Sequence, residues 1–134
     1  MRGDLLTYEL LTAYRTAQFQ YHRLGNSLKV LEDSAKANPG NATIREAAAY
    51  WRGRYDTFQH NIQTNQHFLA IRKWIEEIED EGTRKIFRLA FTSALSWETV
   101  AGLIGNGQTA GALEEAARKY VEDHDDGRDP VPEA

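Results

Sequence analysis

The chain of 134 residues contains no cysteine and only three prolines. Without thiols it cannot form disulfides, use a cysteine nucleophile or bind zinc through sulfur, and the absence fits a reducing compartment. No apolar run approaches the roughly 20 residues that a membrane span needs. The N-terminal stretch contains an acidic residue and lacks the pattern of a secretory signal. We therefore expect a cytoplasmic protein without membrane contact.

Charge is distributed in blocks along the chain. Residues 1–73 carry ten basic and six acidic side chains, whereas residues 74–81 carry five acids and no base. Residues 82–121 are again slightly basic, and from residue 122 onward six acids accompany a single base. Outside the acidic knot (residues 76–81) and the acidic tail, the chain is mildly basic, which permits contact with nucleic acid.

Two heptad-patterned segments dominate the first half. Apolar residues recur at alternating spacings of four and three over residues 10–31 and 44–69, the spacing of a coiled-coil seam. A breaker at residues 35–41 separates them. Helices joined by so short a loop are expected to fold back as an antiparallel hairpin. The predicted association seam comprises Leu10, Tyr14, Tyr21, Leu24, Leu28, Leu31, Trp51, Tyr55, Phe58 and Ile62.

Three local features qualify these helices. Gly25 interrupts the first seam at a cost of about 1 kcal/mol, so we expect a continuous helix with room for a bend. Thr43 and Glu46 have the spacing of a capping box and predict the start of the second helix. Asn65 lies on the second seam and has two interpretations, a partly exposed seam end or a buried residue that fixes register or oligomeric state.

Shorter elements follow in the second half. The second helix is expected to continue to Ile78, and the acidic knot closes it. Three short helices are predicted at residues 83–91, 96–104 and 109–121, with Ser96 and Thr109 as N-caps and Gly105 as a stop. No segment alternates as a strand would. The sequence thus predicts an all-α fold with a helical hairpin (1–80), a helix-turn-helix-like module (82–121) and a disordered acidic tail (122–134).

The module carries a family resemblance. Its two phrases are Arg84-Lys85-Ile86-Phe87-Arg88-Leu89-Ala90-Phe91 and, after a short turn, Ser96-Trp97-Glu98-Thr99-Val100-Ala101. They resemble the C-terminal module of phage late-gene transcriptional activators of the ArpU/RinA type, which is similar to the helix-turn-helix of sigma-factor region 4. The resemblance covers roughly residues 70–121 and rests on short phrases. It implies a DNA-binding regulator of prophage origin.

Such a regulator would place its last helix in the major groove of double-stranded DNA. Gln108 and Thr109, at the start of that helix, are the residues expected near base edges. Phosphate contacts are expected from Arg118, Lys119, Arg84, Lys85 and Arg88. A continuous positive face joining Arg84, Arg88, Arg118 and Lys119 would favour DNA binding. Side chains that point apart or pair with the acidic knot would count against it.

The last helix also departs from this pattern. Glu114 and Glu115 occupy its middle, where carboxylates would repel phosphates, and Gly111 weakens the helix. The alternative function is therefore a non-enzymatic helical interaction or assembly module without DNA binding. Its partner would be a second copy of the chain, giving a homo-oligomer, or another helical protein.

Other candidate sites are weaker. Arg45, Arg52 and Arg54 flank Tyr50 and Trp51, a cluster that fits either a phosphate or acidic partner or a solvated helix face. His60 and His67 are two turns apart, farther than the one-turn spacing that brings two ligands to one metal. No phosphate loop or nucleophile motif is present. We expect no enzymatic activity, cofactor, metal or small-molecule substrate.

Overall fold

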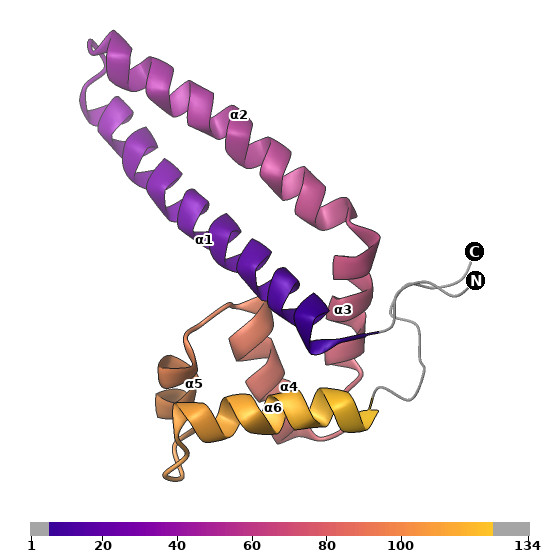
Figure 1. Ribbon diagram of the computed structural model, residues 1–134. Coiled ribbons are helices and arrows are strands. Elements are labelled where there is room, and N and C mark those ends of the chain that lie inside the picture. The colour runs from indigo at the N-terminus through magenta and orange to yellow at the C-terminus, as the bar shows by residue number, and fades with distance from the viewer. Residues whose placement is uncertain (1–5, 125–134) are drawn as a thin grey trace.

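The computed structural model describes residues 6–124, and over this range it contains helices and no strand. The helices are α1 (Tyr8–Ala37), α2 (Ala42–Thr64), α3 (Gln66–Glu76), α4 (Glu81–Phe87), the π-helix η1 (Arg88–Thr92), α5 (Trp97–Ile104) and α6 (Ala110–His124). The predicted all-α class is confirmed. As Figure 1 shows, α1 and α2 run antiparallel and project as an arm from a base formed by the later helices. None of the described helices is both long and apolar enough to cross a bilayer.

Side-chain caps explain where most helices begin. Ser96 accepts a hydrogen bond from the backbone N–H of Thr99, and Thr109 accepts one from Ala112, which confirms both predicted caps. The predicted capping box at Thr43 is wrong. Asn41 caps α2 instead, because its carboxamide oxygen accepts from the N–H of Ile44 at 3.1 Å and starts the helix two residues earlier.

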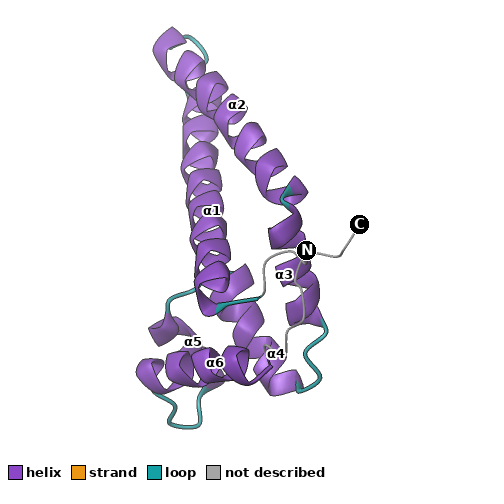
Figure 2. Cartoon of the chain, turned by 45° about the vertical axis from the view of Figure 1, so that its right-hand side comes forward, coloured by secondary structure: helices purple, strands orange, loops and turns teal. Residues whose placement is uncertain are grey.

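Asn65 breaks the helix that the sequence predicts as continuous to Ile78. Its extended backbone, with φ −69° and ψ 116°, ends α2, and its side chain accepts from the N–H of Phe68 to start α3. Asn65 is only partly exposed, as the seam-end interpretation has it. The break lets α3 leave the arm and enter the base (Figure 2).

The predicted helix at 83–91 is also modified at both ends. Asp80 caps it, so α4 begins at Glu81, and its end widens into the π-helix η1. The chain then turns at Ala94, whose φ of 55° lies in the left-handed region and costs a non-glycine residue about 1 kcal/mol. The end of a helix leaves carbonyl groups without helical donors. Here those carbonyls face α1.

Arg15 of α1 supplies the missing donors. Its Nε donates to the carbonyl of Ala90 at 2.9 Å, and its Nη2 donates to the carbonyl of Leu95 at 2.8 Å. The guanidinium carbon also lies 5.9 Å from the ring centre of Trp97. At the preceding position of α1, the hydroxyl of Tyr14 lies 3.2 Å from that of Thr92. Arg15 therefore fixes the turn between η1 and α5 against α1.

The core lies where the arm meets the base. It forms one cluster that includes Leu11 and Tyr14 of α1, Ile71 and Ile75 of α3, and buried residues of every later helix, among them Phe87, Phe91, Trp97, Val100, Leu113, Ala117 and Val121. Residues from both sides of the predicted boundary near residue 80 thus pack into one core. The base consequently sets the direction in which the arm projects.

The arm has a smaller interior of its own, which is partly polar. The hydroxyl of Tyr55 donates to that of Tyr21 at 3.0 Å, and Gln59 Nε2 donates to the same Tyr21 oxygen at 2.8 Å. The two tyrosine rings stack with centres 5.2 Å apart. The hydrogen bond to Tyr21, together with burial, raises the pKa of Tyr55 to about 12. Gly25 lies under this pair, where helices pack closely.

We expect Arg15→Ala to destabilise the protein by about 2 kcal/mol, because it leaves two partly buried carbonyls without their donor. Arg23→Ala is the control, since Arg23 lies on the same helix and is exposed. Urea unfolding of both variants measures the effect. Equal unfolding midpoints for the two variants would contradict the role of Arg15.

Gly25 and Gly53 are two helical glycines that provide a second comparison of variants. A Cβ at Gly25 would lie 3.1 Å from Cε2 of Tyr55, whereas a Cβ at Gly53 would meet nothing within 4 Å. Alanine is better than glycine inside a helix by about 1 kcal/mol. We expect Gly53→Ala to gain close to this amount and Gly25→Ala to gain less, because the Tyr55 ring must move. Urea midpoints test this, and an equal gain would show that the close approach has no cost.

Candidate functional site

The helices α5 and α6 are the candidate helix-turn-helix. Between them the backbone passes through three successive left-handed residues, Gly105, Asn106 and Gly107. Leu113, Ala117 and Val121 fix α6 to the core, and the opposite face of α6 is open to solvent. The predicted base-reading residues Gln108 and Thr109 are both exposed at its start. The geometry therefore leaves the first turn of α6 accessible.

The predicted phosphate contacts do not form a shared set of free cations. Arg88 makes two hydrogen bonds to Glu76 of the acidic knot, at 3.0 and 2.6 Å, and they lower the pKa of this carboxyl. Arg84 donates to the carbonyl of Ile78 at 2.9 Å. Lys85 and Lys119 are exposed and have no ion-pair partner among the described residues.

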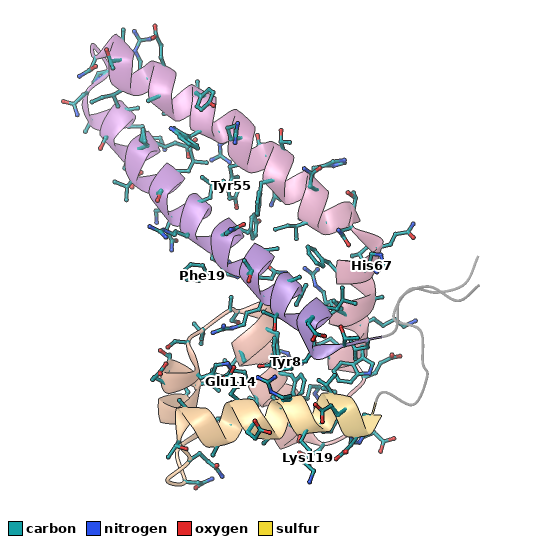
Figure 3. All side chains as sticks on the ribbon, viewed as in Figure 1. Tyr8, Phe19, Tyr55, His67, Glu114 and Lys119 are labelled. Atoms are coloured by element: carbon teal, nitrogen blue, oxygen red, sulfur yellow. The ribbon has the colours of Figure 1, made fainter. Side chains whose placement is uncertain are left out.

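Arg118 is also engaged within the chain. Its guanidinium carbon lies 4.5 Å from the ring centre of Tyr8, and its Nε lies 3.9 Å from Glu115. Glu114 turns toward the same tyrosine, whose hydroxyl donates to it at 3.3 Å (Figure 3). Burial, and then the charge of Glu114, raise the pKa of Tyr8. Of the two carboxylates expected to repel DNA, Glu114 is thus turned toward α1 and Glu115 remains exposed.

The described base is acidic overall. The base, residues 66–124, carries ten acidic and seven basic side chains, whereas the arm, residues 6–65, carries five acidic and seven basic ones. The arm and the base therefore have net charges of opposite sign. Three of the seven cations of the base, Arg84, Arg88 and Arg118, are engaged with groups of the same chain.

Most side chains of the predicted association seam are buried or half-buried inside one copy of the chain. Leu10, Tyr21, Leu24, Leu31, Tyr55 and Phe58 are half-buried, and Tyr14, Leu28 and Ile62 are buried. Trp51 is the exception, with 40% of its surface exposed. The seam pattern therefore holds the arm together, and contacts with another chain have to use other surfaces.

An exposed aromatic cluster on α2 is the clearest such surface. Tyr50 is 58% exposed, and its ring meets that of Trp51 edge to face with centres 5.2 Å apart. The guanidinium carbon of Arg54 lies 6.0 Å from the centre of the Tyr50 ring. We name Tyr50, Trp51 and Arg54 the α2 patch. Arg52, in contrast, pairs with Glu32 at 2.7 Å across the arm.

A hollow of about 460 Å³ lies at the other end of the molecule, where α3 and α6 end. We name it the acidic hollow, and it is lined by Trp74, Glu77, Ile78, Glu79, Asp80, Tyr120 and His124. Glu77 and Glu79 have no ion-pair partner among the described residues. Within residues 6–124, no three potential metal ligands converge. Over the described residues, the hollow therefore combines carboxylates that have no ion-pair partner with aromatic walls.

Only part of these two surfaces is visible in the sequence. The arginines around Tyr50 and Trp51 and the acidic knot are local patterns, but the approach of Tyr120 to Trp74, with ring centres 6.0 Å apart, has no local signal. The chain matches no protein-family model, no curated protein and no solved structure in the comparisons made.

Proposed function

We propose that the chain is a non-enzymatic helical assembly module, which joins copies of itself through the α2 patch and acts without DNA. The observation that carries this proposal is the exposed pair of Tyr50 and Trp51 beside Arg54. Trp, Tyr and Arg are the residue types that contribute most energy to protein interfaces. Isolated exposed apolar residues are common on surfaces, but here Tyr50 contacts both Trp51 and Arg54, so that the three side chains form one contiguous patch.

The electrostatics of the base support assembly over DNA binding. A protein that binds duplex DNA gains much of its affinity by neutralising phosphates. In the base, Arg88 pairs with Glu76, Arg84 is held by a carbonyl, and acids outnumber bases. This is the pairing that counts against a DNA-binding face. Opposite net charges on the arm and the base also favour contact between copies.

We expect the wild-type chain to show a mass that rises with concentration in sedimentation velocity. The double variant Tyr50→Ser/Trp51→Ser should stay monomeric, because it removes the apolar contact area of the α2 patch. Val30→Ser is the matched control, since Val30 is 68% exposed but lies on α1. A wild-type chain that remains monomeric at every concentration would refute the proposal.

A second candidate function is DNA binding through α6. The observation in its favour is the open first turn of α6, with Gln108 and Thr109 exposed and Glu114 turned toward Tyr8. Together with the resemblance of residues 84–101 to the phage activators, this would place α6 in a major groove. Lys119 and Lys85 would then be the available phosphate contacts.

A salt titration of binding to random duplex DNA separates the two functions. We expect no binding at low salt, because the base is acidic. If α6 does bind DNA, log affinity will fall linearly with log salt, and Lys119→Ala will reduce the slope by about 1. Arg54→Ala on the arm is the control. Binding that depends on Lys119 but not on Arg54 would establish the second function in place of the first.

A further inference from the structure

We infer that the copies associate head to tail, with the α2 patch of one copy seated on the acidic hollow of the next. This inference rests on the proposed assembly function and adds which two surfaces meet. The α2 patch is on the basic arm, and the acidic hollow is on the acidic base. The occupant of each surface is thus the opposite end of a second copy of this chain.

A symmetric contact between two α2 patches is disfavoured by charge. Such a contact applies the same surface twice, so each Arg54 would approach the other copy's arm, which also carries net positive charge. A contact between two acidic hollows has the same defect, because Glu77 and Glu79 would face their equivalents. Only the pairing of unlike ends brings opposite charges together.

The chemistry of the two surfaces is complementary in detail. Carboxylates such as Glu77 and Glu79 bind a guanidinium through charge-assisted hydrogen bonds, which are among the strong ones in proteins. Trp74 and Tyr120 line the same hollow and give it apolar walls, against which the ring of Trp51 can pack. A volume of about 460 Å³ is within the range of pockets that hold ligands. Arg54 and the neighbouring Trp51 supply both kinds of group.

Head-to-tail contact has a consequence that a symmetric dimer lacks. Each copy retains one free α2 patch or one free acidic hollow, so assembly continues into rings or open chains. The mass should therefore exceed that of a dimer as concentration rises. Added salt should reduce the mass, because part of the attraction acts between solvated charges.

Mixing two defective variants tests the inference. One variant is Tyr50→Ser/Trp51→Ser, which lacks the α2 patch, and the other is Glu77→Arg/Glu79→Arg, which lacks the acidic hollow. Each alone should be monomeric, and an equimolar mixture should form a complex of two chains and stop there, because only one pair of intact surfaces remains. Glu98→Arg/Glu122→Arg is the control, since it makes the same change of charge on exposed residues of the base outside the hollow.

The outcomes separate the two proposals. If the wild type associates but the hollow variant associates equally well, or the mixture stays monomeric, the head-to-tail arrangement is refuted and assembly stands. If the wild type never associates, both fail. Thermal unfolding of the variants checks folding, and Glu77→Gln/Glu79→Gln replaces the reversal if that variant unfolds. The Glu77→Gln/Glu79→Gln variant should sediment with a lower mass than the wild type at the same concentration. A mass equal to that of the wild type overturns the inference.

Discussion

The two hydrogen bonds from Arg15 to the carbonyls of Ala90 and Leu95 constrain the rest of the structure. The chain leaves η1 through a left-handed residue, Ala94, and cannot continue as a helix. A planar guanidinium with several donors serves both carbonyls at once and stacks on Trp97. Because Arg15 belongs to α1, this contact ties the base to the helix that forms half of the arm.

Local signals predicted most of the helices, and the exceptions have both local and non-local causes. Ser96 and Thr109 were predictable as caps because a cap acts within three residues. Thr43 failed because Asn41, two residues earlier, caps α2. Asn65 also caps its helix within three residues, but the heptad pattern runs through it without a signal for the break. The π-helix η1, in contrast, is held by α1 through Arg15. Periodicity also identified the seam, but it cannot tell whether a seam meets its own chain or another.

The charges of the candidate site were also only partly predictable from the sequence. A sequence reveals how many cations a segment has, but not which are already paired. Arg88 meets Glu76 twelve residues away, and Arg118 lies over Tyr8 at the other end of the chain. The acidic hollow likewise needs Trp74 and Tyr120 to come together. In contrast, Tyr50 and Trp51 are neighbours in sequence, so their cluster was visible before their exposure was known.

An arm of two helices cannot bury all of its apolar side chains. Each helix covers only the stripe that faces its partner, and none of the other described helices covers the outer side of α2. Tyr50 and Trp51 therefore remain in water unless another chain covers them, at a cost that grows with the exposed apolar area. Because both arms carry net positive charge, a symmetric contact between two α2 patches is disfavoured. On the head-to-tail proposal, the acidic base of the next copy covers the aromatic pair and neutralises Arg54 in the same contact.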